Sequence, residues 1–313
     1  MMAECAFWKL SRALRSWATA IGVAVKLAAT ALVLMPVPAA SQESGSMQNH
    51  VLAIGTCPPW HVPSVEVCMN SLKKVLSALS PRLDAGPEHQ HLLVNEGASA
   101  SALKLKATEL SNQLNEDDRL IIYANVPLGL AETANPDDAK GYVLELWAAE
   151  EPEGTLKAVS DGTWMSASAF AALLHTIPAG EVILILDTNN PHAVDIGLLA
   201  THNVDHKDRP EALVISSGPG QAANYSADRT ISLFAKHLSH ALEETDGSLL
   251  DVMTVAAGGT RQSAIPICAD LMGTLAQEDT QAPDCAQVPE IHDPDALMSR
   301  TMLLPLSESD LQN

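Results

Sequence analysis

A short and wholly apolar segment, Val182–Leu186, constrains the fold of this chain more than any other. Gly180 and Glu181 precede it, Asp187 follows it, and no polar residue interrupts it. A run of this length without a polar face is typical of a central parallel strand that helices cover on both sides. In open α/β sheets, functional side chains lie just beyond the carboxyl ends of such strands. We therefore expect a site at residues 187–192, which read DTNNPH.

Other apolar segments alternate with segments of helical periodicity on both sides of this strand. Further strands, with amphipathic helices between them, are expected at His50–Gly55, His91–Val94, Leu120–Ala124 and Ala212–Ser216. This alternation predicts a parallel sheet with right-handed crossovers. The expected fold class is therefore α/β, a three-layer α/β/α sandwich around a mostly parallel sheet. The first and third of these strands should end at the same edge of the sheet as Val182–Leu186.

Composition divides the chain after the N-terminal segment into two parts, residues 48–258 and residues 259–313. Residues 48–258 hold the elements of the expected domain, whose last helix is expected at Leu249–Ala257. Tyr142–Trp147 is expected as a short accessory strand, and Glu150–Asp161 as a loop. Residues 259–313 are rich in Pro, Asp and Gln and poor in apolar residues, so we expect an acidic, loosely packed C-terminal tail.

The N-terminal segment, residues 1–40, has the layout of a secretory signal. A basic leader is followed by the largely apolar Leu27–Met35 and then by small residues suited to cleavage. An uncleaved membrane anchor is the alternative, although Lys26 divides the apolar stretch and neither half reaches the roughly 20 residues of a span. The chain is therefore expected to be secreted or periplasmic.

Charge and composition limit the classes of partner. The formal net charge is −20, which argues against nucleic acid and against anionic membrane surfaces as partners. Only 4% of the residues are aromatic, so few side chains could stack on bases. The partner expected is a protein or a basic peptide, although the acidic surface also serves solubility alone.

Four cysteines remain once the signal is set aside. An exported chain with Cys57, Cys68, Cys268 and Cys285 could form two disulfides in any of three pairings. A Cys57–Cys68 bridge would tie the first strand–helix loop, and a Cys268–Cys285 bridge would tie the tail. Four free thiols are the alternative. No CxxC motif occurs and the histidines are scattered, so we expect neither a metal nor another cofactor.

Several strings, in order and at sensible spacing, resemble the caspase-like peptidases, in particular bacterial metacaspase-type domains. The resemblance covers roughly residues 50–258 and rests on HVLAIG, NEDDRLIIYAN, DGTWMSASAFAALLHTIPAGEVILILD and ALVISSGPGQAANYSADRTISLFAKHLSHAL. These strings resemble the opening strand, the turn and strand before the catalytic His, the helix and strand before the catalytic Cys, and the strand and helix beyond it. The resemblance implies a caspase-like sheet.

The catalytic pair of that family is missing. Where the family has Y-x-S-G-H-G, this chain has YANVPLG, which places Pro127 at or within one residue of the His. Where the family has D-x-C-H-S-G, it has DTNNPH, which places Asn189 at the Cys. A cysteine peptidase needs imidazole to lower the thiol pKa and to carry its proton to the leaving amine. The chain is therefore predicted to be a pseudo-peptidase.

Asp187 is the one family site residue that remains. The resemblance implies that it could still bind an Arg or Lys side chain, and the simpler interpretation is that it caps the strand end by accepting loop amide hydrogen bonds. The alternative function is a cysteine-type endopeptidase with an unrecognised nucleophile. The residues considered for such a nucleophile or its base are Cys57, Ser216, Ser217, His175 and His192, and a metal pair was considered at His202 and His206.

Overall fold

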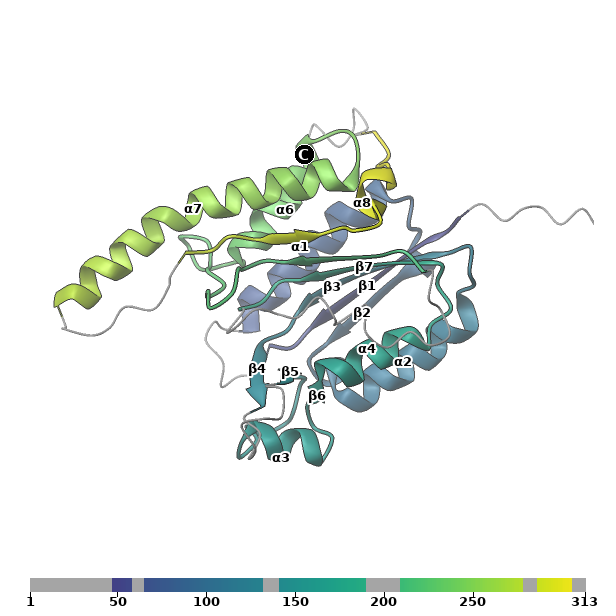
Figure 1. Ribbon diagram of the computed structural model, residues 1–313, viewed down its shortest axis with the longest axis horizontal. Helices are drawn as coiled ribbons and strands as arrows, with labels where there is room; N and C mark the ends of the chain where they lie inside the picture. Colours follow the sequence, from purple (N-terminus) through teal and green to yellow (C-terminus); the bar gives the residue numbers. More distant parts are fainter. Residues whose placement is uncertain (1–46, 58–64, 132–140, 190–208, 278–285, 306–313) are drawn as a thin grey trace, which may run out of the picture. The chain divides into compact units, whose positions relative to one another are not determined.

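The computed structural model describes residues 47–57, 65–131, 141–189, 209–277 and 286–305 (Figure 1). A six-stranded sheet lies at its centre, in the order β2–β1–β3–β7–β8–β9. All neighbouring strands are parallel except β8 and β9, which are antiparallel. The strands are β1 Asn49–Gly55, β2 Gln90–Val94, β3 Arg119–Asn125, β7 Glu181–Leu186, β8 Glu211–Ile215 and β9 Glu290–His292.

Helices cover both faces of this sheet, so the predicted three-layer α/β/α sandwich with a mostly parallel sheet is confirmed (Figure 1). On one face lie α1 (Val65–Arg82), α6 (Leu233–Glu244), α7 (Leu249–Gln277) and α8 (Leu297–Arg300). On the other lie α2 (Ala100–Gln113) and α4 (Ala167–His175). Two short 3-10 helices, η1 (Pro87–His89) and η2 (Asn95–Ala98), flank β2.

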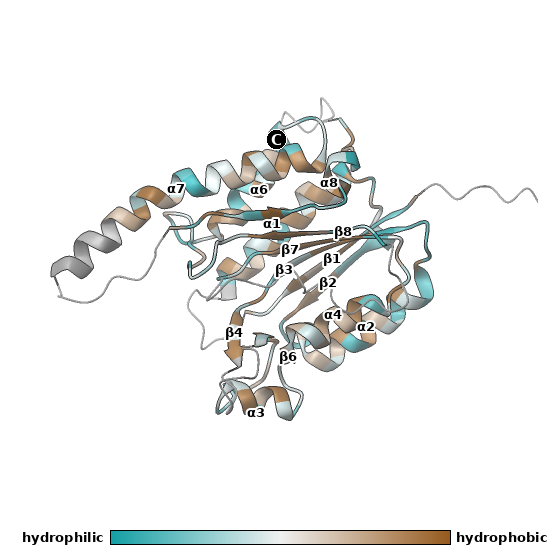
Figure 2. Ribbon diagram, in the orientation of Figure 1, coloured by the Kyte–Doolittle hydropathy of each residue, from teal (hydrophilic) through white to brown (hydrophobic). Residues whose placement is uncertain are grey.

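Strand β7 explains why an unbroken apolar run marks the centre of the sheet. All six of its residues are buried. Val182, Leu184 and Leu186 pack into the apolar core on the α2 and α4 side, whereas Ile183 and Ile185 pack into the core beneath α1, α6 and α7. Because successive side chains point to opposite faces, a strand covered on both sides needs apolar residues at every position. The central strands are accordingly hydrophobic in Figure 2.

A small antiparallel sheet extends the carboxyl end of β3. It contains β4 (Leu128–Ala131), β5 (Gly141–Leu144) and β6 (Met165–Ser166). The accessory strand expected at Tyr142–Trp147 is thus present as β5, displaced by a few residues. The loop expected at Glu150–Asp161 contains a short helix, α3 (Thr155–Ser160), whose Ala158 is buried with Val143 and Trp164.

The expectation of a loosely packed tail after Gly258 is wrong. Helix α7 continues through that position to Gln277, and β9 then adds the outermost strand beside β8. The few apolar residues of this region are well placed, because Leu297 and Met298 of α8 are fully buried against the main core. Gly259 lets α7 approach α6, since a Cβ there would lie 2.5 Å from His237 Nδ1.

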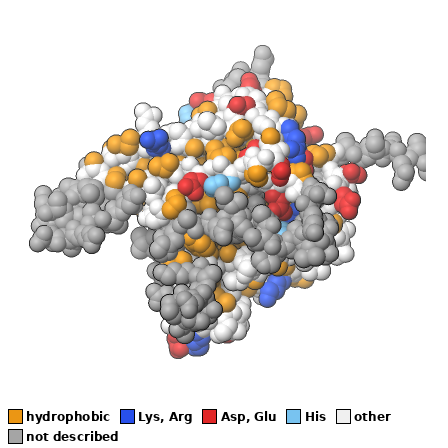
Figure 3. Space-filling view, viewed as in Figure 1, with side chains coloured by type: hydrophobic (Ala, Val, Ile, Leu, Met, Phe, Trp, Pro, Cys, Tyr) orange, Lys and Arg blue, Asp and Glu red, His pale blue; other side chains and the backbone are white. Residues whose placement is uncertain are grey.

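Hydrophobic side chains are exposed in the part of the molecule where α7 lies (Figure 3). On α7 itself, Val255 and Ile265 are 51% and 64% exposed. No helix in the described ranges combines the length and the apolar character that a membrane span requires. The predicted signal segment, residues 1–40, lies outside the described residues.

Candidate functional site

The parallel register gathers three chain segments at one edge of the sheet. Gly55 lies opposite Asn125, and Ala124 lies opposite Leu186, so β1, β3 and β7 end side by side. A cavity of about 300 Å³ opens at this edge. Its lining includes residues from all three strand ends and from the segment before α6, namely Thr56, Cys57, Asn125, Pro127, Asp187, Asn189, Tyr225 and Ser232. The cavity therefore lies where the sequence pattern predicted a site.

Pro127 and Asn189, which the sequence resemblance aligns with a catalytic His and Cys, both line this cavity. Asn189, at the Cys position, donates from Nδ2 to the Leu128 carbonyl oxygen at 3.2 Å and accepts from the Leu128 amide at 3.4 Å. Pro127, at the His position, is the residue before Leu128. No described histidine lines the cavity. Proline and an amide-bonded asparagine supply neither a general base nor a nucleophile for acyl transfer.

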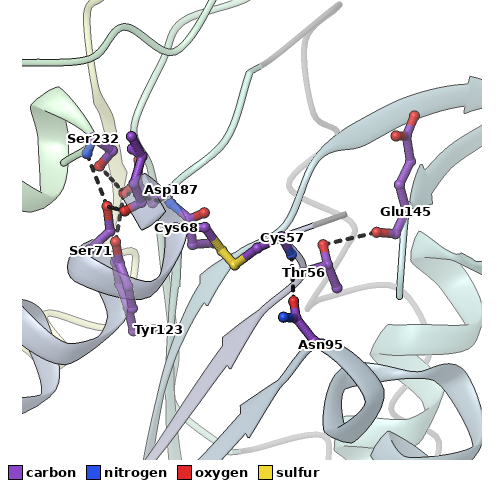
Figure 4. Close-up of a disulfide and its surroundings, with 11 residues drawn as sticks. Thr56, Cys57, Cys68, Ser71, Asn95, Tyr123, Glu145, Asp187 and Ser232 are labelled. Atoms are coloured by element: carbon purple, nitrogen blue, oxygen red, sulfur yellow. Dashed lines mark hydrogen bonds between the residues drawn. A yellow bond between two sulfur atoms is a disulfide. The ribbon is translucent and has the colours of Figure 1, made fainter. Parts of the chain in front are cut away.

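Asp187 is buried beneath the cavity and bound by side chains from β3 and from the N-cap of α6 (Figure 4). Its Oδ2 accepts hydrogen bonds from Tyr123 Oη at 2.6 Å, from Asn125 Nδ2 at 3.1 Å and from Ser232 Oγ. These donors are side chains, so the expectation of loop amide donors is wrong. Its Oδ1 is buried as well and makes no hydrogen bond of normal geometry within the described residues. Oδ2 thus has three donors, whereas Oδ1 has, among the described residues, only the nearby Ser216 hydroxyl, which lowers the carboxyl pKa without forming a hydrogen bond of normal geometry.

The environment of Asp187 alters several titrations. Burial raises the pKa of its carboxyl, while hydrogen bonds from Ser232, Tyr123 and Asn125 act to lower it. Burial raises the pKa of Tyr225, which also lines the cavity, to about 12, and the Asp187 charge adds to this rise. The same two causes raise the pKa of Tyr123 well above its ordinary value. Both phenols are therefore neutral donors at physiological pH.

The cavity is acidic. Asp187 and Glu145 both line it, and no Lys, Arg or His is among its described lining residues. Glu145 lies on the segment after β5, and its carbonyl oxygen accepts a hydrogen bond from Thr56 Oγ1 at 3.0 Å. Two carboxyl groups at a concave site favour a cationic ligand.

The predicted Cys57–Cys68 disulfide is confirmed and lines the same cavity (Figure 4). It joins the end of β1 to α1 with a Cα–Cα distance of 5.6 Å, and the Cys57 amide donates to Asn95 Oδ1 at 3.1 Å. In the oxidised protein Cys57 is not a nucleophile. Cys268 is also disulfide-bonded, and Cys285, its predicted partner, lies outside the described residues.

The serine alternatives are used structurally. Ser216 is fully buried and exchanges hydrogen bonds with the backbone of Thr188, and Ser217 Oγ donates to the Thr188 carbonyl oxygen at 2.7 Å. His175 lies 3.5 Å from Glu211, at the opposite end of β8, so it cannot serve Ser216 as a base. His192, His202 and His206 lie outside the described residues. Within the described ranges, no three His, Cys, Asp or Glu side chains converge as metal ligands.

Sequence reasoning missed Tyr123, Glu145 and Ser232 as residues of the site. Ser232 carried a usable signal, because its side chain caps α6 by accepting from the Ala235 amide, and caps are recognisable in sequence. Its second role, as a donor to a carboxylate 45 residues away, has no local pattern.

Comparison with known proteins adds information on the fold. No protein-family model matches the sequence, and no curated protein matches it significantly. Among solved structures, protein GSU0716 from Geobacter sulfurreducens is similar at a TM-score of 0.53, with 12% identity over 82% of this chain and the whole of that one.

Two caspases are also among the similar structures. The Drosophila initiator caspase Dronc has a TM-score of 0.45 and 8% identity over 82% of each chain. Caspase-1 from Spodoptera frugiperda has a TM-score of 0.43 and 14% identity over 84% of this chain and 90% of that one. At these identities the likeness concerns the fold alone. The order of the helices and strands agrees with the order that the sequence resemblance implies.

Proposed function

We propose that this chain is an exported caspase-fold pseudo-peptidase that binds a protein partner through a basic side chain held at Asp187. One observation carries the proposal: the buried carboxylate has an oxygen that makes no hydrogen bond of normal geometry within the described residues, at an acidic cavity. A buried acceptor without a partner costs free energy, on the order of 1–3 kcal/mol, so a guanidinium or ammonium group that reached it would be bound favourably.

The absence of a peptidase mechanism follows from the same cavity. Acyl transfer would need a nucleophile and a base within hydrogen-bond reach. Asn189 and Pro127 provide neither, Cys57 is held in a disulfide, and no described histidine lines the cavity. The alternative function, an endopeptidase with an unrecognised nucleophile, would have to draw a histidine base from outside the described lining of the cavity.

Export is supported by two features that are independent of each other. The Cys57–Cys68 disulfide fits an oxidising compartment. Residues 1–40 have the composition of a signal, which would direct the chain to the periplasm or the exterior.

Fluorescence anisotropy with labelled peptides tests the binding function. Peptides with a C-terminal Arg or Lys should bind the purified chain at low salt, and the same peptides with Gln at that position should bind at least tenfold more weakly. Asp187→Asn and Glu145→Gln should each weaken binding of the basic peptide. Asp161→Asn, which removes an exposed acid on the turn before β6, serves as the control. Equal binding by wild type and Asp187→Asn would refute the proposal.

Hydrolysis of fluorogenic peptides tests the loss of catalysis. The natural chain should not cleave substrates that end in Arg, Lys or Asp, with or without calcium. The Pro127→His, Asn189→Cys double variant tests the alignment, since any turnover gained there requires both positions to face the cavity. Turnover by the natural chain that disappears on changing Cys57 or Ser216 would establish the endopeptidase alternative instead.

A further inference from the structure

A second and larger hollow lies on the helical face of the domain, apart from the acidic cavity. It is a groove of about 770 Å³ between α1 and α6, and the turn at residues 226–231 forms part of its wall. Its lining shares no residue with the acidic cavity. A volume of this size is within the range of small-molecule sites.

The groove concentrates positive charge on a strongly acidic protein. Of the six lysines in the described ranges, three line it: Lys73 and Lys74 on α1 and Lys236 on α6. Lys74 pairs with Glu243 at 2.5 Å. Lys73 and Lys236 are exposed and form no ion pair within the described residues, and they face the groove from its two helices. With a net charge of −20 over the whole chain, this local excess of cations is unusual.

The two acids in the groove already have local partners. Glu243 is neutralised by Lys74. Asp228 accepts from Ser226 Oγ at 2.5 Å and from the Thr230 amide at 3.2 Å, and these bonds hold its pKa below the ordinary value. These neutral donors leave Asp228 ionised, so the three lysines exceed the two acids of the groove by one positive charge, and Lys73 and Lys236 are the ammonium groups without an ion pair within the described residues.

A half-buried histidine forms another part of the wall. His237 lies beside Lys236, and its Nε2 is 2.9 Å from Ser263 Oγ on α7. Burial lowers the pKa of His237, and the neighbouring Lys236 and His240 lower it further, so the ring is neutral at pH 7 and can donate one N–H. Ile231, which is partly buried, adds an apolar surface.

We propose that this groove binds a phosphate group, either free or as the monoester of a small organic molecule. Two lysines from opposite helices match a dianion better than a single carboxylate, and lysine binds phosphate as a point charge without demanding bidentate geometry. Thr230 supplies a further polar group, while Ile231 and the carbon edge of the His237 ring would contact an organic portion. The proposal rests on no part of the function assigned to Asp187.

Titration calorimetry with phenyl phosphate, inorganic phosphate and phenol tests this site. Phenyl phosphate should bind the purified chain saturably, and phenol should not bind. Inorganic phosphate that binds as tightly as phenyl phosphate would identify free phosphate as the ligand, whereas weaker binding would identify an ester. Tighter binding of citrate than of either phosphate would refute a phosphate site.

Lysine variants locate the binding. Lys73→Met with Lys236→Met should weaken phenyl phosphate binding at least tenfold. The control is Lys104→Met, which removes an exposed lysine on α2, across the sheet, that likewise forms no ion pair within the described residues. Asp187→Asn should leave phosphate binding unchanged, so failure here is separable from failure of peptide binding. Equal losses in the control and the double variant, or no saturable binding, would overturn the proposal.

Discussion

Asn189 and Leu128 are joined by two hydrogen bonds, one in each direction, between the carboxamide of the first and the backbone of the second. The Asn189 side chain therefore ties the segment after β7 to the start of β4. This arrangement mimics the paired bonds of a β-ladder across a gap where the two strands do not pair. The asparagine thus has a structural role that a cysteine could not fill.

Removing the two hydrogen bonds between Asn189 and Leu128, which we call the Asn189 clamp, should destabilise the domain. Asn189→Ala loses both bonds to Leu128, and at about 0.5–1.5 kcal/mol per bond we expect a loss of about 1–2 kcal/mol in the free energy of unfolding. Asn189→Asp keeps the acceptor but places a carboxylate near the Leu128 carbonyl oxygen, so it should not rescue stability. Urea unfolding followed by circular dichroism measures both. An unchanged midpoint in Asn189→Ala would show that the clamp contributes nothing.

The disulfide beside the cavity should be a large contributor to stability. Cys57 and Cys68 are 11 residues apart, and closing a loop of that size stabilises a fold by about 2–3 kcal/mol in the chain-entropy model. The Cys57→Ser, Cys68→Ser double variant should therefore unfold at a lower urea concentration than the oxidised wild type, and reductant should lower the wild-type midpoint more than that of the variant, which keeps the Cys268 disulfide. Equal midpoints for the two proteins under oxidising conditions would contradict this prediction.

The strands and the disulfide were predictable because their signals are local. An apolar run bounded by turn residues marked β7 and β8 to within one residue of their observed ends, and Cys57 and Cys68 flank a single loop. Asp187 was predicted at the site for the same reason, since its position after a buried strand is visible in the sequence. Its hydrogen-bond partners were not, because Tyr123 and Ser232 come from distant elements and neither follows a periodic pattern.

The C-terminal region was misjudged because three residues do most of its packing. Leu297 and Met298 are buried, and Arg300 donates to Glu181 Oε1 at 3.2 and 3.0 Å. Sparse apolar composition predicts a loose tail, but the two consecutive apolar residues of α8 are enough to anchor this one in the core. A pairing between residues 119 positions apart leaves no trace in composition.

Glu181 connects that region to the sheet, which gives a test of the corrected boundary. Its Oε2 binds Arg119 on β3 at 2.7 and 2.5 Å, and its Oε1 binds Arg300 on α8. Glu181→Gln should cost about 3 kcal/mol or more, because it leaves the buried Arg119 without its counter-charge. Arg300→Met should cost less, since its side chain is 43% exposed. Urea unfolding measures the loss of unfolding free energy in each variant. Equal losses would show that the ion pair with Arg300 stabilises the domain as much as the ion pair with Arg119, contrary to this prediction.

A cluster of histidines at the amino end of the sheet should make the domain sensitive to acid. His50 is buried, its ring lies 4.4 Å from that of His89 and 6.0 Å from that of His91, and neither of its nitrogens has a hydrogen-bond partner within the described residues. Burial lowers the pKa of His50 to about 4; His89 and His91 add to this effect, and Asp118 opposes it. The unfolded chain accepts the same proton near pH 6.5.

The sign of the effect follows from these two values. Above pH 6.5, His50 is neutral in both the folded and the unfolded chain, and the free energy of unfolding has its full value. As the pH falls from 6.5 toward 4, the unfolded chain binds the proton and the folded chain does not, so the free energy of unfolding decreases. The loss should reach on the order of 3 kcal/mol at about 1.4 kcal/mol per pKa unit. His50→Phe should remove this part of the pH dependence, and the matched control is the exposed His240→Phe. Urea unfolding at pH 7 and pH 5 decides the matter: a wild-type loss that His50→Phe retains in full would assign the acid sensitivity to other groups.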